Sequence, residues 1–381
     1  MKEFLQAVSD FHAKRLSRVF RLLAETQMPC GLFYVRGAEE LPTFLQFLTK
    51  RGIHVTMIVN FGQPLPDSPV PVVSVRKFAA LGAKPGIMFI SDGGLPACFQ
   101  PYFAQWGIDS LYLEHPDRID GLIEYYDAHL LDLYESYADY QDAASRRAFL
   151  GAMVHVATCN IGDFRLAPEP QYFLEGFTVR PGDIVIDGGA FDGVTSRDFL
   201  AAAGPSGKVF AFEMDGENFP ACAENAAKYG FVAENMGLAE KTQTASFQRG
   251  ENVTASCMVE GGNRTAQFTS IDDYVAARGL SRVDFIKMDI EGAELAALHG
   301  AAQTIARCKP RMAICVYHKP EDMWVLQRYI RSLRPDYTFA FRHYPVDVTE
   351  YLCTDSERAL LRSYGLPYAI PGSGERVLYC R

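Results

Sequence analysis

Three side chains in the second half of the chain have types and positions that suit proton transfer. Asp289 and Glu291 follow the largely apolar run 283–288, and His318 follows the apolar run 312–316. A carboxylate or an imidazole at the end of a buried parallel strand lies at the sheet edge where open α/β proteins bind ligands, and each can take a proton from a hydroxyl group. We therefore expect Asp289, Glu291 and His318 to be catalytic, with Asp289 as the first candidate for the base.

Each acid in this region also has a structural interpretation. Asp289 could cap a helix that is expected to begin near Glu291, and the two roles could coexist. Glu291 and Glu294 are three residues apart on one face of that helix, where they either contact a substrate or only complement the helix dipole. We predict that Glu294, Tyr317 and His343 bind the substrate.

A lysine inside the run 283–288 needs a charged partner if it is buried, because an unpaired buried charge is costly. The nearest acids in the sequence are Asp284 and Asp289, and either could pair with Lys287. An ion pair that orders the strand explains this lysine at least as well as a catalytic role does.

A tight glycine turn follows an earlier apolar stretch. The sequence D-G-G-A-F-D-G occupies residues 187–193, directly after the apolar residues 184–186. Glycines let the backbone approach a ligand closely, and the helix after such a turn offers free N–H groups. A second apolar run ends on Glu213, whose carboxylate could accept hydrogen bonds from ribose hydroxyls. The residues predicted to bind a cofactor are Asp187, Gly188, Gly189, Ala190, Phe191, Gly193, Glu213, Asp215 and Asn218.

The spacing of the glycines discriminates between nucleotide-like cofactors. A nicotinamide site requires G-x-G-x-x-G with a pyrophosphate at the helix N-terminus, and this turn does not supply it. The pattern suits a cofactor without phosphates, such as S-adenosylmethionine. Asp187 would order the turn or meet the methionine ammonium group. Asp215 and Asn218 would extend the site toward the adenine, or only cap the helix expected at 217–228.

These motifs, together with K-M-D-I-E-G-A-E at 287–294, resemble the FkbM family of S-adenosylmethionine-dependent methyltransferases. The resemblance covers roughly residues 171–380 and includes F-E-M-D at 212–215 and Y-H-K-P at 317–320. Phe191 stands where the usual methyltransferase turn has its middle glycine. The resemblance implies a Rossmann-like class I methyltransferase domain with a doubly wound, mostly parallel sheet. It also implies methyl transfer from S-adenosylmethionine to a hydroxyl of a sugar, glycan or secondary metabolite.

Two other functions stay open at this point. One is a non-catalytic, cofactor-binding scaffold protein, which would be favoured if Asp289 and His318 pointed away from the ligand cavity. The other is a nucleotide-sugar or nicotinamide enzyme that acts through the N-terminal part of the chain.

No metal site is expected. Asp272 and Asp273 could join Asp289 and Glu291 around Mg²⁺ through oxygen ligands. The pair more simply begins a helix at 274–278, so metal independence is the better expectation.

The charge and length of the chain limit its partners and its organisation. With 381 residues it is long enough for two domains. A formal net charge of −9 and a pI near 5.5 argue against a nucleic-acid partner, because no basic stripe stands out to neutralise phosphates. The expected partner is a small-molecule or glycan acceptor, with a homo-oligomer possible.

The cysteines and the N-terminus indicate a compartment. Nine cysteines are scattered without a C-x-x-C pair, which is typical of free thiols in a reducing environment. The N-terminus lacks the apolar core of a signal peptide, and no apolar run is long enough to span a bilayer. We expect a cytoplasmic protein without a membrane span.

The chain is predicted to form two α/β domains joined by helices. Residues 1–115 would form an N-terminal helix at 3–26 and a small Rossmann-like α/β domain, residues 116–165 a helical connector, and residues 166–381 the methyltransferase domain. The first turn of the small domain, at 35–40, keeps one glycine and adds two acids. A degenerate nucleotide fold used for docking or scaffolding is the expected role of that domain.

Overall fold

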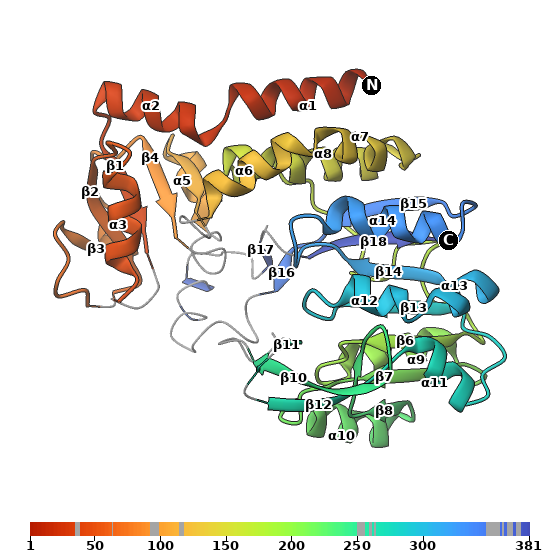
Figure 1. Cartoon of the computed structure of the whole chain (residues 1–381). Helices are drawn as coiled ribbons and strands as arrows, with labels where there is room; N and C mark the ends of the chain where they lie inside the picture. The colour runs from red at the N-terminus through yellow and green to blue at the C-terminus, as the bar shows by residue number, and fades with distance from the viewer. Residues whose placement is uncertain are drawn as a thin grey trace. The chain divides into compact units, whose positions relative to one another are not determined.

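The computed structural model of the chain describes residues 1–34, 39–62, 64–91, 99–113, 118–249, 256–258, 261–262, 264–347, 359, 362–363, 369–370 and 375–381. The chain divides into two compact units (Figure 1). Unit 1 comprises Met1–Tyr137, Arg147–Ala167 and His343–Glu375, and unit 2 comprises Ala138–Arg146, Pro168–Arg342 and Arg376–Arg381. The boundaries expected after residues 115 and 165 stay a prediction.

Unit 1 is built on a parallel sheet with the strand order β3-β2-β1-β4-β5. Every residue of β1 and β4 is buried, as expected for strands covered on both faces. The strands are β1 (Cys30–Phe33), β2 (Val55–Asn60), β3 (Val72–Ser74), β4 (Ile87–Ile90) and β5 (Asp109–Tyr112). A separate two-stranded sheet pairs β16 (Val346–Asp347) with β17 (Ala369–Ile370). The strands expected in this part of the chain are therefore confirmed as a parallel sheet.

The helix expected at 3–26 is two helices, because the chain leaves the helical conformation at Lys14 and Arg15. Both bury an apolar stripe that includes Phe4, Phe11 and Phe20. The remaining elements that lie wholly or partly in unit 1 are α3 (Leu41–Thr49), α4 (Val75–Ala79), α5 (Gln100–Gln105), α6 (Ile119–Ala128), α7 (Leu130–Asp139), α8 (Ala143–Thr158) and the 3₁₀ helix η2 (Ile161–Asp163), after α1 (Lys2–Ala13) and α2 (Leu16–Thr26). The turn at 35–40, predicted to be degenerate, lies mostly outside the described residues.

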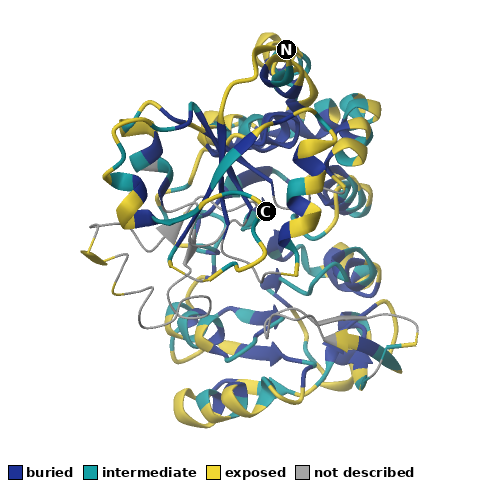
Figure 2. Ribbon diagram, turned by 90° about the vertical axis from the view of Figure 1, so that its left-hand side faces the viewer, coloured by how far each residue is buried: buried dark blue, intermediate teal, exposed yellow. Residues whose placement is uncertain are grey.

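Unit 2 contains a seven-stranded sheet with the order β15-β18-β14-β13-β6-β7-β8. Its central strands run parallel, and β18 pairs antiparallel with β14. The strands are β6 (Ile184–Gly188), β7 (Lys208–Phe212), β8 (Val232–Glu234), β13 (Phe285–Met288), β14 (Arg311–Cys315), β15 (Phe339–His343) and β18 (Arg376–Cys380). The buried strands appear dark blue in Figure 2. The predicted doubly wound, mostly parallel sheet is confirmed.

The helices of unit 2 pack in two groups. In one group α9 packs on β6 and β7, with α10 against α9 and β8, and in the other α13 and α12 pack on α14. The helices are α9 (Val194–Ala203), α10 (Phe219–Tyr229), α11 (Ile271–Ala277), α12 (Glu294–His299), α13 (Ala302–Cys308) and α14 (Asp322–Leu333). A second sheet with the order β11-β10-β12-β9 combines β9 (Gly237–Leu238), β10 (Gln243–Arg249), β11 (Ser256–Met258) and β12 (Arg264–Thr269).

The strand order of unit 2 determines where a ligand can bind. From β6 the chain adds β7 and β8 on one side of the sheet and later β13 and β14 on the other. The connections therefore diverge between β6 and β13, which leaves a crevice beyond the carboxyl ends of these two strands. The turn after β6 and the acids after β13 meet at this edge.

Candidate active site at the carboxyl edge of the unit 2 sheet

The glycine turn after β6 is tied to both neighbouring strands. The backbone N–H groups of Gly189 and Ala190 donate to the carbonyl of Phe212, each at 3.0 Å. Gly189 has a φ of 74°, and a Cβ atom there would lie 1.8 Å from the carbonyl oxygen of Asp289. Glycine at this position thus allows the turn to lie against the chain that leaves β13. Phe191 occupies the left-handed region with a φ of 51°, a conformation that the usual glycine would adopt more easily.

A buried ion pair connects β6 with β13. Lys287 is 3% exposed, and its Nζ lies 3.2 Å from Oδ1 of Asp187. The same ammonium group donates to the carbonyls of Gly188 and Gly189 at 3.1 and 2.7 Å. Burial alone would lower the pKa of Lys287, but the nearby carboxylates outweigh it and raise that pKa. Lys287 therefore holds the glycine turn in place.

Asp284 and Asp289 were both candidates for the partner of Lys287, but the buried ion pair is made with Asp187. Asp284 instead accepts hydrogen bonds from Ile184 N and Arg282 Nε, both at 2.8 Å. Asp187 is the partner because β6 and β13 are neighbours in register, with Lys287 opposite Asp187. Its second oxygen accepts a hydrogen bond from Ser196 Oγ at 2.5 Å.

The acid at the end of β7 is enclosed by backbone N–H groups. The two carboxylate oxygens of Glu213 accept hydrogen bonds from Phe191 N at 2.9 Å and from Asp215 N at 2.8 Å. Burial raises the pKa of Glu213 to about 7, although both hydrogen bonds lower it. Each carboxylate oxygen keeps a further lone pair, so Glu213 can still accept a hydrogen bond from a ligand hydroxyl.

Asp215 and Asn218 lie in the turn before α10. Asp215 is fully buried, and its Oδ1 accepts a hydrogen bond from Glu217 N at 2.9 Å. Asn218 is the N-cap residue of α10, but its side chain makes no capping hydrogen bond. Arg264, on β12, approaches Asp215 at 3.7 Å and Glu217 at 2.6 Å. Asp215 therefore stabilises the local turn, whereas its role toward a cofactor stays a prediction.

A cavity of about 550 Å³ opens at Met214, the residue after Glu213, between the turn after β7 and the small sheet. None of the residues that line this cavity was predicted as a site residue, because they come from several elements and share no motif. Met214 and Asn235 could have been found, since Asn235 directly follows β8 and Met214 comes two residues after the end of β7. The cavity is lined by Met214, Gly216, Glu217, Asn235, Thr244, Phe247, Arg264, Thr265, Ala266 and Gln267.

Asp289 is held by two phenol groups. Its Oδ2 accepts a hydrogen bond from Tyr172 and its Oδ1 accepts one from Tyr317, each at 2.9 Å. Burial would raise the pKa of Asp289, but Lys287, His318 and hydrogen bonds lower it overall. Tyr172 was not predicted as a site residue. It lies 117 residues before Asp289 in the sequence, so no local spacing indicates the contact.

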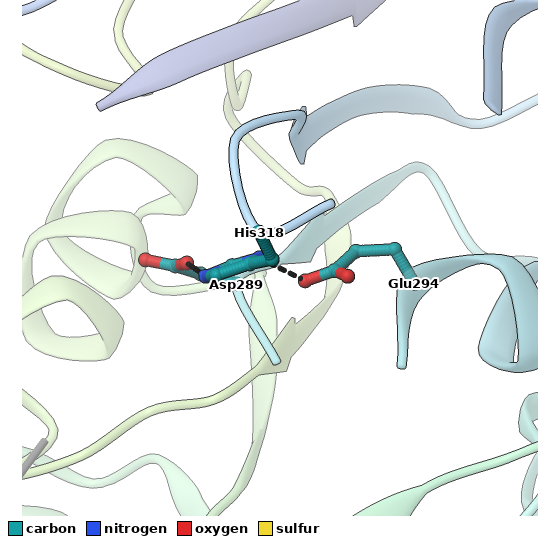
Figure 3. Close-up of side chains that lie close together, drawn as sticks. All are labelled: Asp289, Glu294 and His318. Carbon is teal, nitrogen blue, oxygen red and sulfur yellow. Dashed lines mark ion pairs between the residues drawn. The ribbon is translucent and has the colours of Figure 1, made fainter. Parts of the chain in front are cut away.

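His318 lies between carboxylates (Figure 3). Its Nδ1 is 2.9 Å from Oε1 of Glu294, and its Nε2 is 3.4 Å from Oδ1 of Asp289 and 3.5 Å from Oε2 of Glu291. Burial alone would lower the pKa of His318, but the three carboxylates raise it to about 9. The three residues predicted to be catalytic are thus brought together at one point.

The expected helix near Glu291 begins later than predicted. Residue 294 is the first residue of α12, with Ala293 as its N-cap, so Asp289 does not cap this helix. Glu291 is in the left-handed region with a φ of 56°, and therefore Glu291 and Glu294 do not share a helical face. Glu294 is buried, and its Oε1 accepts a hydrogen bond from Ile290 N at 2.9 Å. Because the Glu294 side chain is buried against His318, it is better placed to position that imidazole than to make the predicted contact with a substrate.

Of the other two residues predicted to bind the substrate, one lies at the site and one does not. Tyr317 is partly exposed beside Asp289 and His318, where a ligand could reach it. His343 is fully buried at the end of β15, which is separated from β14 by β18, and its ring packs against Phe164 with a centroid distance of 4.3 Å. The structure therefore gives His343 a packing contact and no place beside His318.

Asp289, Glu294 and His318 each place one possible ligand atom within 4.8 Å of the others, a spacing that could hold a metal ion. However, the imidazole stands between the two carboxylates with a different nitrogen facing each, whereas ligands of one ion point to a common centre. Asp272 and Asp273 are engaged elsewhere: Asp272 accepts from the backbone of Gln303 and Thr304, and Asp273 from Thr242.

The sequence and fold resemble known methyltransferases. Residues 187–352 match the family model of the methyltransferase FkbM domain. The crystal structure of the methyltransferase FkbM from Methylobacillus flagellatus KT aligns with 100% of this chain and 98% of its own, at a TM-score of 0.67 and 19% identity. A SAM-dependent methyltransferase from Aquifex aeolicus aligns with 54% of this chain and 85% of its own, at a TM-score of 0.28 and 16% identity. No curated protein matches the sequence. Among the described residues, no helix is long and apolar enough to cross a membrane.

Proposed function

This chain contains an S-adenosylmethionine-dependent methyltransferase domain of the FkbM family, and from this premise we propose that it methylates a hydroxyl group of a sugar, glycan or secondary metabolite. The observation that supports a hydroxyl acceptor is the group of acid–base side chains beyond β13 and β14. The imidazole Nε2 of His318 lies 3.4 Å from Oδ1 of Asp289 and 3.5 Å from Oε2 of Glu291. A hydroxyl is a poor nucleophile while it is protonated, so its methylation is faster when a nearby carboxylate or imidazole takes the proton.

The cofactor would bind across the turn after β6 and the end of β7. Glu213 has lone pairs for the ribose hydroxyls, and the cavity lined by Met214 and Asn235 could enclose the adenine. Asp187 would order the turn through Lys287 and Ser196, the first of its two predicted roles. The sulfonium supplies the methyl group when the cofactor is bound, and the protein has to align the acceptor with it.

Calorimetric titration with S-adenosylhomocysteine tests the cofactor site. We expect micromolar binding by the full chain and at least tenfold weaker binding by Glu213→Ala. Glu224→Ala, on the exposed face of α10, is the matched control and should bind like wild type. Failure to bind S-adenosylhomocysteine would contradict the proposal, and NADH binding that survives Glu213→Ala would favour a nucleotide enzyme acting through unit 1.

An acceptor screen tests the chemistry. We expect the labelled methyl group of S-adenosylmethionine to reach sugar or other alcohol acceptors in a panel that also contains amines and carboxylic acids. Transfer to an amine alone would rule out O-methylation. Cofactor binding without transfer to any member of a broad panel would favour the scaffold function.

A further inference from the structure

We propose that Glu291 takes the proton of the acceptor hydroxyl, and that His318 is a positively charged positioning residue that holds the surrounding carboxylates. This inference rests on the proposed methyl transfer to a hydroxyl. The sequence suggested His318 as a proton acceptor, whereas here it keeps its protons. Glu291 replaces Asp289 as the base.

The surroundings of His318 leave neither ring nitrogen free to accept a proton. One nitrogen faces Glu294 at 2.9 Å, and the other faces Asp289 and Glu291 at 3.4 and 3.5 Å. A neutral imidazole would direct a lone pair at one of these carboxylates, which would repel it, so both nitrogens carry protons. The side chain is only 8% exposed, which keeps water from screening these contacts.

Other charged groups near this cluster have different partners. Lys287 is paired with Asp187, and Asp322, at the start of α14, accepts a hydrogen bond from Lys319 N at 2.7 Å. Asp322 also interacts electrostatically with Glu294, His318 and Lys319. The cation that stands among the three carboxylates is therefore His318.

Asp289 is a weaker base than Glu291. Both of its oxygens already accept phenol hydrogen bonds at 2.9 Å, and its pKa is lowered overall, which stabilises the ionised form. Glu294 is turned inward and is 1% exposed, so an acceptor could not reach it.

Glu291 has the access and the freedom that the other acids lack. Its side chain is 30% exposed, and among the described residues the ion-pair partner of its carboxylate is His318. The left-handed backbone at Glu291 continues into Gly292, whose φ is 90°, so a tight turn presents this side chain at the sheet edge. Burial raises the pKa of Glu291 to about 7, which suits a base at neutral pH.

The step balances as follows. The acceptor O–H bond breaks and its proton goes to the Glu291 carboxylate, while the oxygen forms a bond to the methyl carbon. The S–CH₃ bond breaks and its electron pair stays on sulfur, which gives the methyl ether and S-adenosylhomocysteine. Glu291 then releases its proton to water. His318 keeps its protons throughout.

Nuclear magnetic resonance of the ¹⁵N-labelled full chain with S-adenosylhomocysteine tests the charge of His318 without an acceptor. The His318 signal is assigned by its loss in His318→Gln, and His54, exposed in unit 1, serves as the reference through His54→Gln. We expect both His318 nitrogens to be protonated at pH 7.5, with titration near pH 9. A neutral His318 ring at pH 7.5 would overturn the inference.

A second measurement follows the Glu291 carboxyl group by ¹³Cδ labelling, with Glu291→Gln for assignment. We expect titration near pH 7 in wild type and at higher pH in His318→Gln, because the variant removes the cation beside Glu291. A Glu291 carboxyl that titrates at the ordinary glutamate pH, or does not respond to His318→Gln, would overturn the proposal.

Calorimetry separates this inference from the proposed function. Glu291→Gln should bind S-adenosylhomocysteine like wild type and like the exposed control Glu224→Gln, since Glu291 faces the acceptor. With an acceptor from the screen, Glu291→Gln should lower kcat at least a hundredfold with little change in KM, and a kcat near wild type would refute the base. If wild type fails to bind S-adenosylhomocysteine, the proposed function itself fails; if it binds but His318 is neutral, only this inference fails.

Discussion

Glu213 shows how one buried carboxylate can make cofactor binding depend on pH. Its pKa is raised to about 7 by burial, so the free protein changes the charge of this group near neutrality. Ribose hydroxyls donate to the ionised form, and protonation removes the acceptor sites that they need. Ligand binding should therefore compete with protonation of Glu213.

We predict that S-adenosylhomocysteine binds about tenfold more weakly at pH 6 than at pH 8, because a ligand that requires the ionised form loses about tenfold per pH unit below the pKa. Calorimetric titration across this range measures the effect. Glu213→Gln cannot titrate and should bind weakly with a flat profile. An equal loss of affinity in this variant would assign the pH dependence to another group.

At the scale of elements, the glycine turn after β6 and the chain after β13 are packed directly against each other. A Cβ atom on residue 189 would lie 1.8 Å from the carbonyl oxygen of Asp289. Such an overlap with backbone cannot be relieved by rotating a side chain, so the two strand ends would have to separate. The same movement would displace Asp289 from its tyrosine partners.

We predict that Gly189→Ala lowers the free energy of unfolding by about 3 kcal/mol or more, from this overlap together with the positive φ. Gly279→Ala is the matched control, since Gly279 has a φ of 61° but open space around its Cβ position. It should cost only about 1 kcal/mol. Denaturant unfolding measures both variants, and equal costs would show that the contact with Asp289 is not as close as described.

At the scale of the molecule, charge and fold both bear on the choice of partners. The chain carries 46 acidic and 37 basic residues, which gives the net charge of −9. The alignment with the Methylobacillus flagellatus protein covers 100% of this chain, so the shared fold includes unit 1 as well as unit 2. A net negative charge of this size opposes binding to the phosphates of nucleic acids.

We predict no binding of transfer RNA by fluorescence anisotropy at about 50 mM salt, where non-specific phosphate contacts are strong. A sugar-containing acceptor from the screen should bind in the same buffer. Salt-dependent RNA binding would show that a local basic groove overrides the net charge, and it would redirect the search for the acceptor.

The sequence by itself determined the sheet and the kind of cofactor. Apolar runs that end in D-G-G-A-F-D-G, in Glu213 and in Asp289 are local patterns, and parallel strands bring their carboxyl ends to one edge whatever the other contacts are. The positions of Asp187, Glu213, Asp289 and His318 at this edge could therefore be predicted. The helix after Asp289 was placed too early, because the left-handed backbone at Glu291 has no clear sequence signal.

Only the tertiary structure decided which side chains meet and which of them carry charge. Lys287 pairs with Asp187 rather than with a neighbour in sequence, because strand register sets that contact. Tyr172 reaches Asp289 across 117 residues, and His318 comes from a separate segment to lie among the three carboxylates of residues 289–294. The pKa of a group depends on burial and on charges within a few ångströms, and those are fixed only when the segments pack.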